Sequence, residues 1–420
     1  MILRNKYINK IKHHLDIFSG VFLVGHRQVG KTSIMQSLIE YNIIPKSHSV
    51  YINMDEISIG GNMIFENTDQ FISYIETYYK FDWNKITYLL IDEFKNIKNF
   101  NILLKSLIDK YKDKKWICTS SGNYQWSNEI VEGLAGRVGQ IPIYPLDWSE
   151  YLVFKNSKSE NITNYSGIYK DLIHEYMIYG GYPAVVLATS LSSKKLILKS
   201  IIDSTFSFDI KNFLKDEQVS DIRKLFVYLA ENSGSLISYE GIGSTLGIKS
   251  YHIKKYIDIL INTNIIYSLN PYCTNPKKEI SNKNKIYISD FGIMNFFISR
   301  RTLLNESKFI EMFVANTIIT NLNIDTKLYY RQNRNETEID FILYQNNKII
   351  PIECKSNDKD IIPKAFHGFY DTYADRIDYY VKTSLSLQKQ RILEDHMIVK
   401  IAPFYKLHTM LFGKDKEPLK

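Results

Sequence analysis

The sequence predicts an α/β fold in three parts: a parallel-sheet domain in residues 1–155, a mostly helical region in residues 167–300, and a smaller α/β domain in residues 305–410. Up to about residue 150, short apolar runs alternate with helical segments, as in doubly wound parallel sheets. A polar stretch at residues 156–166 then separates this domain from the rest. With 420 residues, the chain is also long for a single hydrophobic core.

The first strand of the predicted sheet leads into a glycine-rich loop. Residues 25–32 read Gly-His-Arg-Gln-Val-Gly-Lys-Thr, a complete G-x-x-x-x-G-K-T motif between an apolar run and a helical stretch. In this motif, backbone N–H groups surround phosphate oxygens, the lysine reaches the terminal phosphates and the threonine hydroxyl binds Mg²⁺. The sequence therefore predicts a P-loop that binds ATP and Mg²⁺ through Gly25, His26, Arg27, Gln28, Val29, Gly30, Lys31, Thr32 and Ser33.

A second apolar run, residues 86–91, ends in the acids Asp92 and Glu93. Polar ends of parallel strands converge at one edge of the sheet, so we expect both acids near the P-loop. Asp92 is predicted to hold Mg²⁺ and Glu93 to orient the attacking water, as a hydrolysing ATPase requires. The alternatives are a pair of acids that caps the next helix, or a small-molecule kinase that uses the same loop.

Two further candidates come from the end of the predicted sheet domain. The strand at residues 116–120 ends in Ser121-Gly122-Asn123, and Asn123 or Ser121 is expected to polarise the same water, although Ser-Gly-Asn also forms turns. Arg137 is a candidate arginine finger, which would act on a neighbouring subunit of a homo-oligomer. The alternative for Arg137 is a surface salt bridge.

The helical region contains a stretch, residues 222–267, that resembles a winged-helix unit. Residues 246–248 are expected to form a turn before a helix with apolar residues at helical spacing. That last helix carries three lysines, which indicate either contact with DNA or a solvated face of a packing module. These lysines are Lys249, Lys254 and Lys255.

The C-terminal domain is predicted to contain a β-hairpin that turns at Asn346-Asn347. A two-residue turn there pairs residues whose numbers sum to 693, so Asp340 faces Glu353, and Lys355 shares their face of the sheet. Two carboxylates and an ammonium are what Mg²⁺-assisted phosphodiester cleavage needs. The alternatives are a cross-strand salt bridge on a solvated face, or a nuclease fold that has lost its catalytic activity. Pro351 faces Ile342 at a non-hydrogen-bonded pair, so the hairpin tolerates the proline.

Asp340 followed by Glu353-Cys354-Lys355 resembles the core of PD-(D/E)xK nucleases, and Glu311 matches the acid on the preceding helix of that core. The resemblance implies a metal site formed by Glu311, Asp340 and Glu353. Over nearly its whole length, the chain also resembles prokaryotic AAA-type ATPases in which an ATPase domain precedes a domain of unknown function with a nuclease-like core. The segments that carry this resemblance are Gly25–Thr32, Leu90–Glu93, Ser120–Gly122, Gly136–Arg137, Pro145–Tyr151, Gly180–Pro183 and Tyr287–Gly292. Phe94-Lys95 departs from the apolar-Gln pair that is commoner in that family.

The composition of the chain bears on its cellular location and on its partners. No apolar run is long enough to cross a bilayer, and three scattered cysteines fit a cytoplasmic protein. The net charge of +8 permits contact with nucleic acid without requiring it. The sequence thus predicts a cytoplasmic Mg²⁺-dependent ATPase whose nucleotide cycle controls a nuclease-like, DNA-contacting module. The alternative is a non-catalytic ATP-dependent switch that assembles with a protein partner.

Overall fold

The computed structural model describes residues 2–57, 63–121, 133–155, 167–273, 283–298, 306–332, 338–393 and 397–413. The chain divides into two compact units. Unit 1 comprises Met1–Pro145, Ser200–Phe213 and Asn262–Asn264, and unit 2 comprises Leu146–Lys199, Leu214–Ile261 and Ile265–Lys420. Among the described residues, no helix has both the length and the apolar character needed to cross a membrane.

The described part of unit 1 is built on a five-stranded sheet with the strand order β2-β3-β4-β1-β5. All neighbouring strands are parallel, which confirms the predicted α/β fold. The strand β4 lies between β1, which leads into the P-loop, and β3, which ends in the acids. The strands are β1 (Gly20–Gly25), β2 (Ser49–Asn53), β3 (Tyr88–Asp92), β4 (Lys115–Ser121) and β5 (Val138–Pro142).

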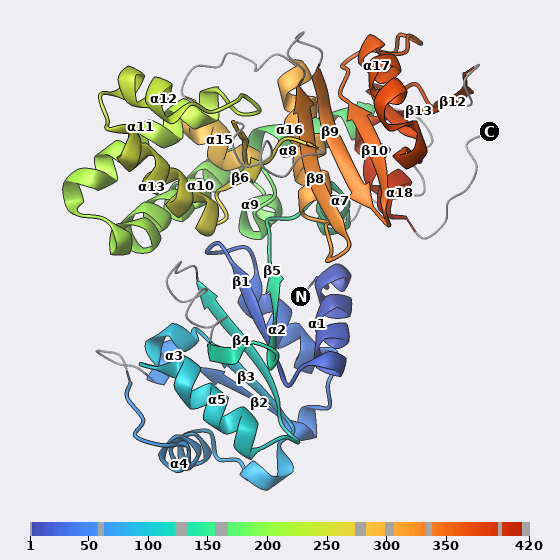
Figure 1. Cartoon of the computed structure of the whole chain (residues 1–420). Helices are drawn as coiled ribbons and strands as arrows, with labels where there is room; N and C mark the ends of the chain where they lie inside the picture. Colours follow the sequence, from blue (N-terminus) through green and yellow to red (C-terminus); the bar gives the residue numbers. More distant parts are fainter. Residues whose placement is uncertain are drawn as a thin grey trace. The chain divides into compact units, whose positions relative to one another are not determined.

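Helices cover both faces of this sheet (Figure 1). On one face, α4 and α5 pack their apolar sides on the alternate strand residues that point toward them, and Phe71, Ile75 and Leu104 are completely buried there. On the other face, α1 and α2 lie against β1. The helices of unit 1 are α1 (Asn5–Ile17), α2 (Lys31–Glu40), α3 (Met54–Ile57), α4 (Thr68–Tyr79) and α5 (Phe100–Lys110).

The first half of unit 2 is mostly helical, as predicted. Three helices, α11, α12 and α13, are followed by the antiparallel strands β6 and β7. Gly247 ends α12 with a φ of 70°, so the predicted turn at residues 246–248 is confirmed. The elements are α7 (Trp148–Phe154), α8 (Gly167–Tyr179), α9 (Pro183–Leu187), α10 (Leu191–Ser204), α11 (Asp216–Glu231), α12 (Tyr239–Leu246), α13 (Ser250–Asn262), β6 (Ile266–Leu269), β7 (Lys285–Ile288) and α15 (Phe291–Phe297).

The second half of unit 2 contains, within its described residues, a six-stranded mixed sheet with the order β12-β13-β11-β10-β9-β8. The strands β10, β11 and β13 run parallel to one another, and the other pairs are antiparallel. The elements are α16 (Glu306–Ile319), β8 (Thr326–Gln332), β9 (Glu338–Gln345), β10 (Lys348–Glu353), α17 (Lys364–Tyr373), β11 (Tyr380–Ser384), β12 (Lys389–Ile392), β13 (Ile398–Pro403) and α18 (Leu407–Phe412).

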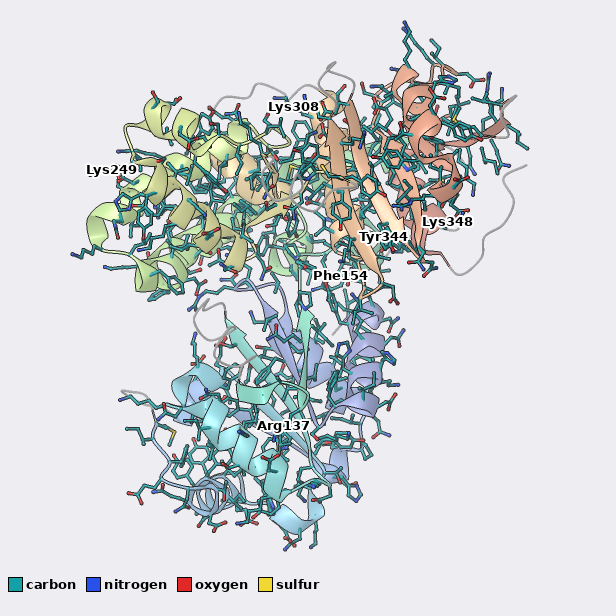
Figure 2. All side chains as sticks on the ribbon, viewed as in Figure 1. Arg137, Phe154, Lys249, Lys308, Tyr344 and Lys348 are labelled. Atoms are coloured by element: carbon teal, nitrogen blue, oxygen red, sulfur yellow. The ribbon has the colours of Figure 1, made fainter. Side chains whose placement is uncertain are left out.

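The hairpin of β9 and β10 has the predicted register. Ile349 pairs with Tyr344 and Pro351 with Ile342, so the numbers of each pair sum to 693. Asn346 and Asn347 have φ values of 51° and 63°, the left-handed backbone that a two-residue hairpin turn needs. The turn lies beside the labelled residues Tyr344 and Lys348 (Figure 2).

Pro351 also limits the next strand pairing. The ladder between β10 and β11 includes only Ile352 and Glu353, just after the proline. Proline has no N–H to donate to a second neighbour.

The two units divide the chain differently from the three predicted domains. The helix α7 belongs to unit 2 because the Trp148 ring packs against Tyr169 and Phe313, with ring centroids 5.4 and 6.0 Å away. The helical region and the mixed sheet share unit 2, since Pro271 bridges to Tyr330, whose hydroxyl donates to the carbonyl of residue 283. Residues 200–213 return to unit 1.

Candidate functional site

The P-loop joins the end of β1 to the start of α2. Gly30 has a φ of 97° at the N-terminus of α2, a conformation that glycine adopts without strain. Gly25 is needed for a different reason: a Cβ there would lie 2.2 Å from the carbonyl oxygen of Ile143. Glycine therefore allows the start of the loop to pass close to the chain that follows β5.

Lys31 lies inside its own loop. Its ammonium donates to the carbonyl oxygens of Gly25 and His26, each at 2.8 Å, and the residue is only 6% exposed. Burial lowers the pKa of Lys31 from 10.5 to about 8, although the carboxylates of Glu93, Asp209 and Asp92 act in the opposite direction. The ammonium is thus held inside the loop by the carbonyl oxygens of its first two residues.

Asp92 is held at the end of β3 by side chains from both neighbouring strands. The Tyr51 hydroxyl on β2 donates to Oδ2 at 2.8 Å, and the Thr119 hydroxyl on β4 donates to Oδ1. Burial and the bond to Asp92 raise the pKa of Tyr51, so its hydroxyl keeps its proton. Asp92 is almost completely buried, and its two hydrogen bonds fix the carboxylate's orientation.

Glu93 follows in a left-handed conformation, with a φ of 53°. Its N–H donates to the Thr119 hydroxyl at 3.3 Å, and its carboxylate pairs with Lys95 at 3.2 Å. A non-glycine residue with this backbone is held by its surroundings, and such residues cluster at functional sites. Lys95, the residue that departs from the resembled family, is therefore the ion-pair partner of the predicted water-orienting acid.

Sequence reasoning did not identify four residues at this site. Tyr51 and Thr119 hold Asp92, and Thr205 and Asp209 contact the P-loop. The Thr205 hydroxyl lies 2.8 Å from Nε2 of His26. Burial, reinforced by Lys31, lowers the pKa of His26 to about 3, so this imidazole is neutral at pH 7.

The remaining predictions for unit 1 have different outcomes. Asn123 lies outside the described residues, and so does the end of its predicted turn. Arg137 precedes β5 at the amino end of the sheet, where the N–H groups of Ser19 and Gly20 donate to its carbonyl. Because β1 runs from Gly20 to Gly25, Arg137 is a strand length, roughly 17 Å, from the P-loop of its own chain.

The Arg137 guanidinium makes a two-pronged ion pair with Asp109 on α5, at 2.8 and 3.1 Å. Arg137 is labelled in Figure 2. This contact is the surface salt bridge that the sequence left open as the alternative. The Arg137 guanidinium is therefore engaged away from the P-loop of its own chain.

The second predicted cluster lies in unit 2, on the hairpin. Oδ2 of Asp340 accepts the N–H of Cys354 at 2.7 Å, and Oε1 of Glu353 pairs with Lys355 at 2.7 Å. Burial raises the pKa of Asp340 well above its usual range, and the neighbouring Glu353 and Glu311 carboxylates add to this effect. Among the described residues, the buried Oε2 of Glu353 has no hydrogen-bond partner. The predicted convergence of these three side chains is present.

Glu311 is occupied by other groups. Its Oε1 accepts the Tyr287 hydroxyl at 2.6 Å and pairs with the buried Lys285 at 3.3 Å, and Lys285 also pairs with Glu338. Within the described ranges, no three His, Cys, Asp or Glu side chains form a group able to hold a metal ion. An ammonium from β7 therefore supplies positive charge beside the acids, where the sequence predicted a divalent cation.

Three family models match the chain. Residues 18–152 match an AAA domain, residues 170–304 a domain of unknown function (DUF8612), and residues 306–405 another domain of unknown function (DUF4143). Together with the P-loop on a parallel sheet, the first match supports an ATP-binding AAA-type domain.

Two relatives with similar sequences are described only as uncharacterized proteins, so their names indicate no function for this chain. An uncharacterized protein of Haemophilus influenzae is 26% identical over 84% of this chain and 86% of its own length. One of Methanocaldococcus jannaschii is 24% identical over 97% of this chain and 90% of its own.

Solved structures that are similar include a Walker-type ATPase of Pyrococcus abyssi, with 13% identity, a TM-score of 0.44, and coverage of 71% of this chain and 96% of that one. For DnaA of Aquifex aeolicus bound to AMPPCP, the identity is 13%, the TM-score 0.27, and the coverage 61% of this chain and 87% of that one. At these TM-scores, neither structure bears on function.

Proposed function

We propose that the protein is a Mg²⁺-dependent ATPase whose nucleotide cycle controls the module formed by its helical region and mixed sheet. The observation that carries the proposal is the buried Lys31 ammonium inside the P-loop, with Asp92 and Glu93 within electrostatic reach. The hydrolysis step and the control of unit 2 go beyond ATP binding.

The residues present fit a magnesium nucleotide. Thr32 and Asp92 would hold Mg²⁺, which when bound neutralises charge on the phosphates. Tyr51 and Thr119 orient the Asp92 carboxylate, and the P-loop N–H groups and Lys31 bind the phosphate oxygens.

We assign Glu93 as the acid that orients the attacking water. It must leave its ion pair with Lys95 to do so. Asn123 remains a candidate for the same water. Arg137 remains a candidate arginine finger only for a neighbouring subunit, and only if its ion pair with Asp109 opens.

Hydrolysis assays on two variants test this assignment. Lys31→Ala is expected to abolish ATP binding, whereas Glu93→Gln should bind ATP normally and lose at least about tenfold in turnover, a typical contribution of a positioned acid or base being 10²–10⁴. Lys46→Ala, a matched change at an exposed residue of unit 1, should behave as wild type. Phosphate transfer to a metabolite that survives Glu93→Gln would point instead to a kinase.

We propose three working modules: the ATPase domain at residues 1–155, a winged-helix region at residues 167–300, and a nuclease-like domain at residues 305–410. The three matched families cover nearly these ranges, which supports the division. The run of α11, α12 and α13 followed by the β6–β7 pair supports the winged-helix assignment. Its exposed Lys249, labelled in Figure 2, and Lys254 would contact DNA. The three scattered cysteines support a cytoplasmic location.

The nuclease-like site is compatible with two functions, one catalytic and one structural. The adjacent Asp340 and Glu353, with Lys355 beside them, support Mg²⁺-assisted cleavage of a phosphodiester. Lys285 favours the second candidate function, a nucleotide switch whose nuclease-like domain is structural, because its ammonium already offsets the acidic charge.

Incubation of DNA with the intact protein, Mg²⁺ and ATP separates these two functions. Cleavage that is lost in Asp340→Ala would support a nuclease. Absence of cleavage across DNA and RNA substrates, with ATP binding intact, would support the switch.

A further inference from the structure

A short segment of unit 1 that lies far from the P-loop in sequence packs directly against it. Residues Thr205–Ile210 form a π-helix at the end of α10. A π-helix is rare and frequently occurs at functional sites, because its wider turn is less stable than an α-helix. Nothing in the ATPase assignment requires this segment.

The segment contacts two consecutive residues of the loop. The Arg27 guanidinium pairs with Oδ1 of Asp209 at 2.7 Å and lies 5.4 Å from the centre of the Phe208 ring. His26 bonds to Thr205 at 2.8 Å. These contacts tie two residues of the loop to the segment.

Asp209 is an unusual residue to place beside an anion-binding loop. It is 3% exposed, and its Oδ2 is buried without a hydrogen-bond partner among the described residues. Burial raises the pKa of this carboxyl, while Arg27 and Lys31 act in the opposite direction. A buried, half-satisfied carboxylate costs stability, and such groups occur at functional sites.

The charge of Asp209 acts on the phosphate-binding lysine. The carboxylates of Glu93, Asp209 and Asp92 all raise the pKa of Lys31, and Asp209 ranks second among them. Glu93 and Asp92 have assigned roles in hydrolysis and metal binding. Asp209 has neither role: it helps to keep Lys31 charged, but its own negative charge beside the loop opposes a triphosphate, and it occupies Arg27.

We propose that Thr205–Ile210 is an autoinhibitory latch on the P-loop, in which the Asp209 carboxylate takes the place of an anionic ligand and must withdraw before a nucleoside triphosphate binds. This inference rests on the proposed function, and it adds the regulation of the same site. The chain on both sides of the segment, up to Lys199 and from Leu214, belongs to unit 2. Release of the latch therefore frees a connection to unit 2 and gives the nucleotide a route to control it.

Equilibrium binding of a fluorescent ATP analogue with Mg²⁺ tests the latch. Asp209→Asn keeps the shape of the side chain and removes its charge, so the Kd should fall by about tenfold or more, as expected for removal of a buried unit charge near a triphosphate. The matched control, Asp16→Asn, makes the same change at an exposed residue of α1 and should leave the Kd unchanged. A Kd for Asp209→Asn equal to or weaker than wild type overturns the latch alone. Absence of binding by all three proteins overturns the ATPase proposal and the latch with it.

Hydrogen exchange gives a second test, and its first measurement uses the wild-type protein alone. Addition of the Mg²⁺–ATP analogue should speed exchange of the backbone amides in residues 205–210. In Asp209→Asn, whose fold is verified by its thermal unfolding midpoint, these amides should exchange quickly even without nucleotide. Nucleotide binding that leaves residues 205–210 equally or better protected overturns the proposal.

Discussion

Replacing Thr119 with valine tests the geometry of the hydrolytic site at one atom. The Thr119 hydroxyl donates to Asp92 and accepts the N–H of Glu93, so one oxygen positions both acids. Valine has nearly the same shape as threonine and lacks only the hydroxyl. The side chain is completely buried, so water does not replace the lost contacts.

The size of the effect follows from these two hydrogen bonds. A hydrogen bond to a charged group contributes about 1.5–3 kcal/mol, and a buried N–H left without a partner costs about 1–3 kcal/mol. The Thr119→Val change should therefore weaken the positioning of the acids by roughly 2.5–6 kcal/mol in total, on these magnitudes. Because a misplacement of about 1 Å can cost a hundredfold in rate, we expect turnover to fall by about ten- to a hundredfold. ATP affinity, which depends mainly on the P-loop, should change much less.

Steady-state phosphate release, combined with ATP binding, measures both quantities. Thr119→Ser is the matched control, because it keeps the hydroxyl and loses one methyl group, worth about 1 kcal/mol of stability. Its turnover should stay close to that of wild type. The reasoning is refuted if Thr119→Val hydrolyses ATP at the wild-type rate, or if Thr119→Ser loses as much activity as valine.

Three further predictions concern unit 2. Lys285→Met leaves Glu311 and Glu338 without their ammonium, so the free energy of unfolding should fall by about 3–5 kcal/mol. Mg²⁺ should then raise the melting temperature of the variant but not that of the wild type. A variant that melts at the wild-type temperature would contradict this prediction. Burial raises the pKa of Asp290 from 3.8 to about 6, so the folded state holds this proton more tightly than the unfolded state. Its stabilising contribution is complete below about pH 4 and falls by roughly 3 kcal/mol as the pH rises to 6, a loss that denaturant titrations should find in wild type but not in Asp290→Asn. Gly180→Ala places a Cβ 2.2 Å from an Asp290 oxygen at a φ of 74°, so it should lower the melting temperature by several degrees, whereas the same substitution at the open Gly368 should not.

Features set by neighbouring residues could be predicted from the sequence. The P-loop is a contiguous motif, and its strand and helix follow from local apolar patterns. The hairpin register follows from Asn346 and Asn347, because side chains alternate strictly along each strand. The proximity of Asp340, Glu353 and Lys355 was therefore predictable.

Features set by contacts between distant residues could not be predicted in this way. Thr119 reaches Asp92 because β4 lies between β1 and β3, and strand order is not visible in local periodicity. Asp209 is 182 positions from Arg27 and carries no motif. The predicted first domain also included the residues of α7. The structure places α7 in unit 2, because the aromatic partners of Trp148 come from α8 and α16.

Arg137 is an intermediate case. The residue was chosen for its type, but its distance from the P-loop depends on the direction of β5. Since β5 runs parallel to β1 and begins at Val138, a residue just before it lies at the amino end of the sheet. A prediction of strand direction would have placed Arg137 at that edge.

The most direct test of the account is calorimetric titration of Mg²⁺–ATP into the wild-type protein and into Lys31→Ala. The account predicts saturable binding at one site per chain in wild type and none in the variant, with both proteins folded. Equal affinity in the two proteins, or no affinity in the wild type, would contradict the claim that residues 25–32 bind the triphosphate.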